Sequence, residues 1–152
     1  MPLSIIFGWP AVIGVTLGAG LGNLVGDTVS GFTGLSLGID VIGGSLANLI
    51  AATLAWKIGK LGWTFRGTRI AWVLAVNTET AVIALLVGSY LGWLFELPPW
   101  ISIGGLLAGS IVAISVGGYI LLRVLGLQEN LEVFRSAGLV PARSMARPSK
   151  EQ

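Results

Sequence analysis

The sequence predicts an all-α integral membrane protein, a bundle of about four transmembrane helices with both termini in the cytoplasm. Of its 152 residues, 54% are hydrophobic and only 11% are charged, whereas soluble domains carry about 25% charged residues. Four long apolar stretches approach the roughly 20 residues that a helix needs to cross a bilayer. We therefore expect one transmembrane domain over residues 1–125 and a cytoplasmic polar tail over residues 126–152.

The first expected span covers residues 3–26. Proline suits the first turn of a helix, so the main helix is expected to start near Pro10. Residues 1–9 are then expected to form a separate piece. Glycine recurs at every fourth position, and small residues four apart let another helix approach closely in a bilayer. The stretch therefore predicts a tightly packed membrane helix. Its regularly spaced glycines are Gly14, Gly18, Gly22 and Gly26.

The other spans are expected at residues 39–56, 70–95 and 101–125. The last span repeats the spacing of small residues seen in the first one. The two glycine-bearing spans are therefore expected to approach each other or a shared partner. The packing glycines of the last span are Gly105, Gly109 and Gly117.

The distribution of charge predicts the orientation. Basic residues gather in the loop between the second and third spans and in the tail, whereas the other two connections carry only acidic charges. Lys and Arg concentrate in cytoplasmic segments, so this loop and the C-terminus are expected in the cytoplasm. Within the tail, residues 127–135 are expected to form a short surface helix and residues 142–152 to be disordered. Tryptophans near the span ends fit an aromatic belt: Trp56, Trp63, Trp93 and Trp100.

Glu79 is the first candidate for a ligand-binding residue. It lies about nine residues into the third span, which places it roughly 14 Å deep, near the middle of the bilayer. An ionisable group there costs about 2.5–3.5 kcal/mol on insertion scales, so it should face a cavity or a partner. We hypothesise that Glu79, Asn77 and Trp72 line a ligand site. The alternative is that a protonated Glu79 only ties helices together.

Four further polar residues lie near the ends or inside the first two spans. Asp27 and Asp40 bracket the outer loop and are candidates for the mouth of a cavity, or else are interfacial residues. Asn23 and Asn48 lie deeper, where they line the site or form hydrogen bonds between helices. Some aromatic residues either contact a flat ligand or anchor the protein at the membrane interface: Tyr90, Trp93, Trp100 and Tyr119.

The sequence does not predict an enzyme. It has no histidine and no cysteine, which removes the commonest general base and several metal ligands. Neither Asp27 nor Asp40 has the Gly-x-Gly-Asp context of an intramembrane aspartyl protease, and no glycine-rich loop leads into Gly-Lys-Ser/Thr. We expect no cofactor, no metal and no nucleic-acid partner; the expected partners are the lipid bilayer and a small-molecule ligand.

Two stretches of the sequence resemble a known family. The first runs Pro10-Ala-Val-Ile-Gly-Val-Thr-Leu-Gly-Ala-Gly-Leu-Gly-Asn-Leu-Val25, and the second runs Asp40-Val-Ile-Gly-Gly-Ser-Leu-Ala-Asn-Leu-Ile-Ala-Ala-Thr-Leu54. Together with Phe95-Glu-Leu-Pro-Pro-Trp100 and Gly117-Gly-Tyr-Ile-Leu-Leu-Arg123, they resemble QueT-type membrane proteins. These are relatives of the substrate-binding (S) components of energy-coupling factor (ECF) transporters. The resemblance covers roughly residues 3–125.

The resemblance implies six helices with both termini in the cytoplasm, of which this chain would supply the last four. It also implies a bound vitamin-like or modified-base precursor, since QueT proteins are assigned to uptake of queuosine precursors, and a partner module of one transmembrane coupling protein and two ATPases. The first helix of the family has no counterpart here, and residues 1–9 look like the end of a second helix. Either the true start lies upstream or the chain is a reduced relative. The family commonly has Glu after the glycine that matches Gly109, but this chain has Ser110, so the resemblance does not fix the ligand.

The favoured hypothesis is a substrate-capture subunit of an ECF-type importer. The alternative is a small glycine-rich membrane protein that assembles with itself into a channel or scaffold. A pore should show a sustained polar face in one span, and none of the four does. A third hypothesis is a remnant without transport activity.

Overall fold

All the regular elements that the computed structural model describes, in residues 2–65 and 69–139, are helices. In this part of the chain, four helical segments are long and apolar enough to cross a membrane. They are Trp9–Val29, Gly34–Gly59, Ile70–Leu94 and Pro99–Leu125. This confirms the predicted all-α membrane bundle. The tail residues 142–152, for which disorder was expected, lie outside the described residues.

The first expected span is broken at Gly8 into α1 (Pro2–Phe7) and α2 (Trp9–Val29). Gly8 has a φ of 74°, which residues with a side chain rarely adopt. A Cβ atom on Gly8 would also lie 3.1 Å from Nε1 of Trp56. Pro10 lies in the first turn of α2, where its missing N–H costs nothing, so the chain reverses just before the proline.

The later elements follow the expected order with shifted ends. They are α3 (Gly34–Gly59), α4 (Ile70–Leu94), α5 (Pro99–Ser110), the π-helix η1 (Ile111–Gly118), α6 (Tyr119–Leu125) and α7 (Gln128–Ser136). The last three elements before α7 form one membrane-crossing segment, in which the π-helical turn brings Ser115 within 2.8 Å of the Thr80 hydroxyl on α4. The expected surface helix at residues 127–135 corresponds to α7.

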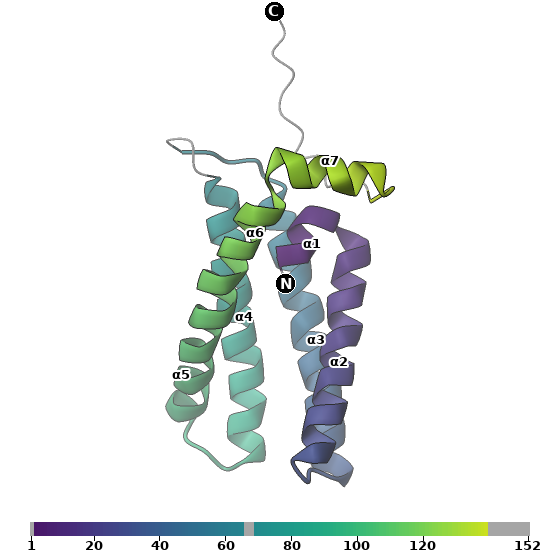
Figure 1. The fold of residues 1–152 in the computed structure, drawn as a ribbon. Coiled ribbons are helices and arrows are strands. Elements are labelled where there is room, and N and C mark those ends of the chain that lie inside the picture. The colour runs from purple at the N-terminus through teal and green to yellow at the C-terminus, as the bar shows by residue number, and fades with distance from the viewer. Residues whose placement is uncertain (1, 66–68, 140–152) are drawn as a thin grey trace, which may run out of the picture.

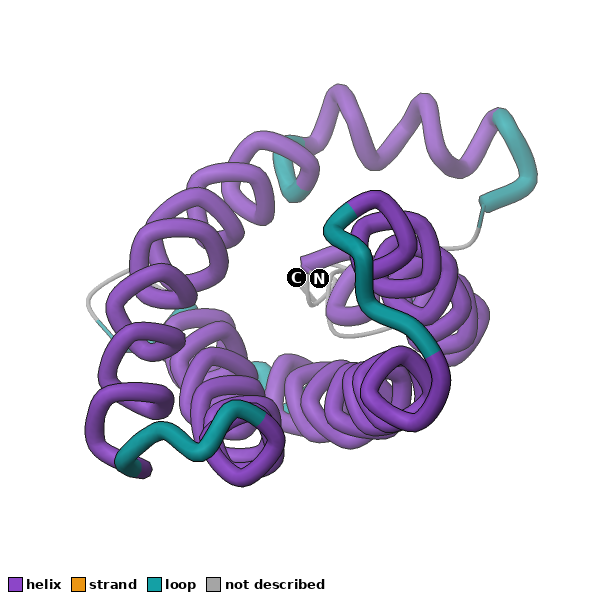
Figure 2. Tube along the Cα trace, turned by 90° about the horizontal axis from the view of Figure 1, so that it is seen from below, coloured by secondary structure: helices purple, strands orange, loops and turns teal. Residues whose placement is uncertain are grey.

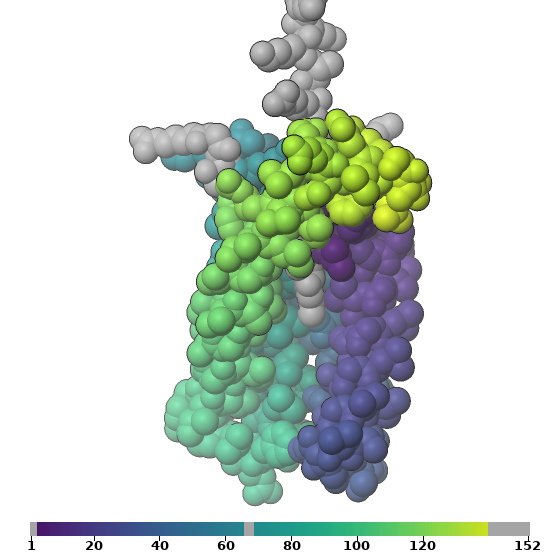
Figure 3. All heavy atoms as spheres, in the orientation of Figure 1, coloured from purple at the N-terminus to yellow at the C-terminus, as the bar shows by residue number. Residues whose placement is uncertain are grey.

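The long helices run side by side, and α7 lies across one end of the bundle (Figures 1 and 3). They pack in chain order, with α2 on α3, α3 on α4 and α4 on α5. Viewed along the bundle, they form an arc with α2 at one end and α5 at the other (Figure 2). Consecutive helices are therefore antiparallel neighbours, which brings the α2–α3 and α4–α5 connections to the end opposite α7.

The best-packed region of the bundle lies at the α7 end. Its centre contains Ile5 and Ile6 of α1, Trp72 of α4, Leu122 of α6 and Leu131 of α7. The rings of Phe7 and Phe134 meet edge to face at 5.0 Å. The short helices α1 and α7 thus fill and cover the end of the bundle that the basic residues surround.

The regularly spaced glycines make no close contact with another helix among the residues that the structure describes. A Cβ atom added to any glycine of the α2 series, or to Gly105 or Gly109, would meet nothing of the described chain within 4 Å. At Gly117 it would meet only the carbonyl oxygen of Val112 on its own segment, at 3.5 Å. The close contacts are made by other glycines, for example Gly88, where a Cβ atom would lie 2.8 Å from Cα of Ile103. Spacing identifies a stripe of small residues, but not the face of the helix that meets its neighbour.

Candidate functional site

Two aspartates and a tyrosine meet at the end of the bundle opposite α7. Asp27 lies near the end of α2, Asp40 near the start of α3, and Tyr90 near the end of α4. The antiparallel packing of these three helices brings their ends together. The hydroxyl of Tyr90 donates a hydrogen bond of 2.5 Å to Oδ1 of Asp40, and Asp27 lines the same cavity as Asp40.

Adjacent glycines on α3 make room for this cluster. A Cβ atom on Gly43 would lie 3.2 Å from Cε1 of Tyr90, and one on Gly44 would overlap the side-chain amide of Asn23. With that space open, Nδ2 of Asn23 donates a hydrogen bond of 3.1 Å to the backbone oxygen of Asp40. The local sequence of α3 therefore lets side chains from α2 and α4 converge on Asp40.

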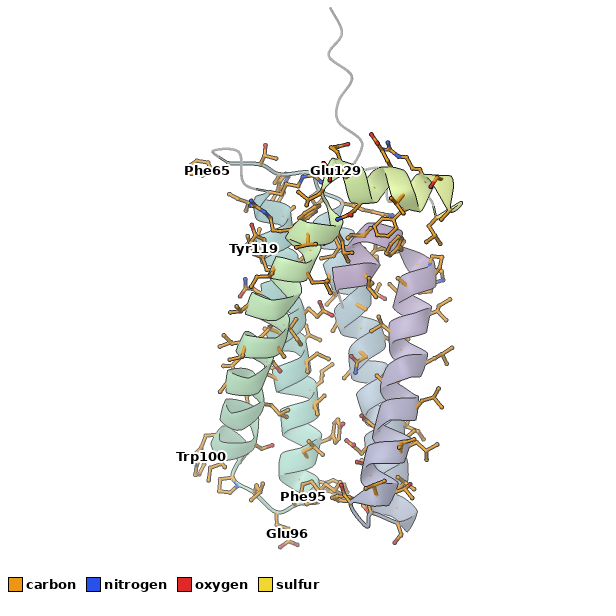
Figure 4. All side chains as sticks on the ribbon, viewed as in Figure 1. Phe65, Phe95, Glu96, Trp100, Tyr119 and Glu129 are labelled. Atoms are coloured by element: carbon orange, nitrogen blue, oxygen red, sulfur yellow. The ribbon has the colours of Figure 1, made fainter. Side chains whose placement is uncertain are left out.

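A cavity of about 150 Å³ opens beside the two carboxyl groups. A cavity of this size holds a molecule of about one aromatic ring. Phe32 and Phe95 meet edge to face at 5.4 Å on its wall, and Figure 4 shows Phe95 at the end of the bundle away from α7. The cavity is lined by Asp27, Phe32, Asp40, Leu91, Leu94 and Phe95.

One carboxyl oxygen of Asp27 is enclosed by the protein beside this cavity. Oδ2 of Asp27 is buried and has no hydrogen-bond partner among the described residues. A buried oxygen without a partner loses the hydrogen bonds it had in water. A ligand with an N–H or a positive charge would suit the two carboxyl groups that line the cavity, while its flat apolar part packs on the two phenylalanine rings.

Asn48 and Glu79 lie deeper in the bundle. Asn48 lies about 12 Å further along α3 than Asp40. Its Nδ2 donates a hydrogen bond of 2.8 Å to the carbonyl oxygen of Gly44. Glu79 is completely buried in α4. Oδ1 of Asn48 and both carboxyl oxygens of Glu79 have no hydrogen-bond partner among the described residues. Neither residue lines the cavity of the two aspartates.

Among the cavities of the described residues, none is lined by Trp72, Asn77 and Glu79 together. Trp72 is packed in the core near the α7 end. Asn77 is exposed, and it donates to the carbonyl of Val73 at 2.7 Å and accepts from Ser115 at 3.3 Å. The reason is helical geometry, since residues two apart point in nearly opposite directions. The sequence hypothesis grouped Asn77 with Glu79 by their closeness in the chain.

The aromatic wall of the cavity was the part that sequence reasoning missed. The sequence predicts Tyr90 as either a ligand contact or an interface anchor, and it does not single out Phe32 or Phe95 as candidates. A usable signal was present, because both phenylalanines lie just beyond helix ends at the side of the membrane where the acidic residues gather. The exposed tryptophans Trp93 and Trp100 do lie at the bundle end, as an aromatic belt requires.

The chain was compared with known proteins. A family model described as QueT transporter matches residues 1–126. No curated protein and no solved structure matches the chain. The matched range includes all four membrane-crossing segments and every residue of the cavity.

Proposed function

This chain belongs to the QueT transporter family, and from this premise we propose that it is the substrate-capture subunit of an ECF-type importer. Transport is the role of the family. We infer that the captured molecule is a small vitamin-like compound or queuosine precursor. It would be held in the cavity that Asp27 and Asp40 line.

The cavity is the observation that carries this proposal. It combines two carboxyl groups, one of them held by Tyr90, and two aromatic rings. Small-molecule sites have this composition, a mostly apolar wall with a few polar groups that fix orientation. Asn23 has a supporting role, because its bond to the backbone of Asp40 holds α2 and α3 together beside the cavity.

The distribution of charge supports an outward-facing cavity. Basic side chains of the described residues lie at the α7 end, on the last turn of α3, the start of α4 and the end of α6. The cavity end carries acidic residues instead. The positive-inside rule places the α7 end in the cytoplasm, so the cavity would open to the outside, where an importer meets its substrate.

The energy for transport must come from partners in this proposal. The sequence has no Gly-Lys-Ser/Thr motif for nucleotide binding. A transmembrane coupling protein and two ATPases would supply it. The open glycine stripes of α2 and α5 are surfaces on which helices of another membrane protein can pack closely.

The test is native mass spectrometry of the protein extracted gently from its own membranes. The proposal predicts a small retained ligand and co-purifying coupling and ATPase subunits. The same open stripes also suit assembly of identical chains. Ligand-free multiples of the chain's own mass would therefore contradict the importer proposal and favour the self-assembling alternative.

A further inference from the structure

A second cavity lies at the opposite end of the bundle from the aspartates. It measures about 180 Å³ and is formed where the start of α4 meets the junction between α6 and α7. Figure 4 shows Tyr119, one of its residues, toward the end that α7 covers. The cavity is lined by Arg69, Trp72, Tyr119, Arg123, Gly126 and Leu127.

The described residues that line this second cavity include positive charges and no acid. Arg69 and Arg123 both line it, and none of its lining residues is acidic. The guanidinium carbon of Arg69 lies 4.5 Å from the centre of the Trp72 ring, a cation–π contact that holds the flat group in place. Burial lowers the pKa of Arg69. A partly buried cation loses hydration, and an anion within reach would compensate for that loss.

The junction between α6 and α7 is shaped to close over the same place. A Cβ atom on Gly126 would lie 2.5 Å from the Trp72 ring and 2.9 Å from the carbonyl oxygen of Leu122. Glycine therefore allows the chain to turn directly against the ring that holds Arg69. Arg123 precedes this turn at the end of α6, so the two arginines line the cavity from separate segments of the chain.

We propose that this second cavity binds a phosphate oxyanion. Each guanidinium offers a planar pair of N–H donors that matches two phosphate oxygens, and the Tyr119 hydroxyl is a further donor. The source of the phosphate is either a free phosphate ion or the headgroup of an anionic lipid at the membrane surface. Leu127 and Trp72 supply apolar wall beside the arginines, which suits the glycerol part of a lipid.

The experiment uses the full chain with Arg69→Gln and Arg123→Gln variants. Inorganic phosphate is titrated calorimetrically in a neutral detergent, and bound phosphatidylglycerol is counted by native mass spectrometry against phosphatidylcholine. Arg135→Gln is the matched control, because Arg135 is an exposed residue of α7 at the same end and does not line the cavity. Thermal unfolding of each variant checks that it is folded.

We expect the apparent affinity to fall about tenfold or more in Arg69→Gln and Arg123→Gln and to be unchanged in Arg135→Gln. Arg123→Lys should bind the phosphate probe more tightly than Arg123→Gln and less tightly than the unmodified chain. Lysine keeps the positive charge but lacks the planar pair of N–H donors. Binding of phosphatidylglycerol alone would identify a lipid site, and binding of inorganic phosphate as well would identify a site for the free ion. The proposal is overturned if the unmodified chain binds neither probe, or if folded variants of both arginines bind like Arg135→Gln.

Discussion

At the scale of single residues, the two aspartates of the first cavity differ in how their oxygens are satisfied. The carboxyl group of Asp40 accepts a hydrogen bond from the hydroxyl of Tyr90. Its backbone oxygen accepts a hydrogen bond from the side-chain amide of Asn23. Asp27 has a buried oxygen with no partner among the described residues. Asp40 is thus held in position by protein groups, and both aspartates line the cavity, so we expect both to contact a ligand.

Glu79 is the residue at which the structure changes the sequence hypothesis most. If Glu79 lined a ligand site, as the sequence hypothesis has it, Glu79→Gln would weaken ligand retention. However, Glu79 lies about 16 Å along α4 from Tyr90 and is buried with no hydrogen-bond partner among the described residues. We now expect Glu79→Gln to retain ligand like the unmodified chain. It should also unfold at the same or a higher temperature, because it removes a buried ionisable group.

Thermal unfolding in detergent, combined with measurement of the bound ligand, checks this prediction. A variant that melts at a clearly lower temperature would show that Glu79 has a stabilising partner outside the described residues. A variant that loses its ligand while remaining folded would return Glu79 to the binding site.

At the scale of the helices, glycine has two distinct uses in this chain. On α3 and α4 it allows close contact with a neighbouring side chain or backbone, as at Gly44 and Gly88. On α2 it forms a stripe that nothing in the described chain covers. The sequence predicted the stripe because its spacing is regular, but the contact glycines are irregularly spaced. Whether a glycine faces a neighbouring helix depends on how its own helix is rotated about its axis. That rotation is set by the packing of the neighbouring helices.

Gly88→Ala and Gly22→Ala test this difference as a matched pair. A methyl group at Gly88 would lie 2.8 Å from Cα of Ile103, which is backbone and cannot swing away. We expect Gly88→Ala to destabilise the protein by about 1–3 kcal/mol. Gly22→Ala meets open space and should be neutral or stabilising by about 0.5–1 kcal/mol.

Thermal unfolding of the two purified variants in the same detergent distinguishes the outcomes. Equal melting temperatures would show that the α4–α5 contact is looser than the structure indicates. Strong destabilisation by Gly22→Ala would show that the α2 stripe is covered by a partner that remains bound during purification.

At the scale of the whole molecule, the sequence predicted the fold class and placed two of the residues that line the first cavity near each other. Four apolar stretches sufficed for the membrane bundle because length and hydropathy are local properties. Asp27 and Asp40 were predicted at one cavity mouth because they flank the same connection. Tyr90 and Phe95 come from a distant helix, so their contacts depend on the packing of α4 against α3. No local sequence pattern predicts that packing. The cavity of Arg69 and Arg123 could not be predicted for the same reason, because it also joins segments far apart in the sequence.

Orientation is a property of the whole molecule that cysteine labelling can test, since the chain has no cysteine of its own. Glu96 lies at the cavity end and Glu129 on α7 (Figure 4). If the positive-inside rule holds, a membrane-impermeant maleimide added to intact cells should label Glu96→Cys. Glu129→Cys should react only after the cells are opened. The reverse pattern would place the first cavity on the cytoplasmic side and contradict capture from outside.

The central claim, that the first cavity captures the substrate, is tested most directly by the ligand that the protein retains. Native mass spectrometry should compare the unmodified chain with Asp27→Asn and Asp40→Asn, and with Glu96→Gln as a control. Glu96 is an exposed acidic residue at the same end that does not line the cavity. We expect ligand occupancy to fall about tenfold in the two aspartate variants and to be unchanged in Glu96→Gln. Equal occupancy in all four folded proteins would contradict the account and place the ligand elsewhere.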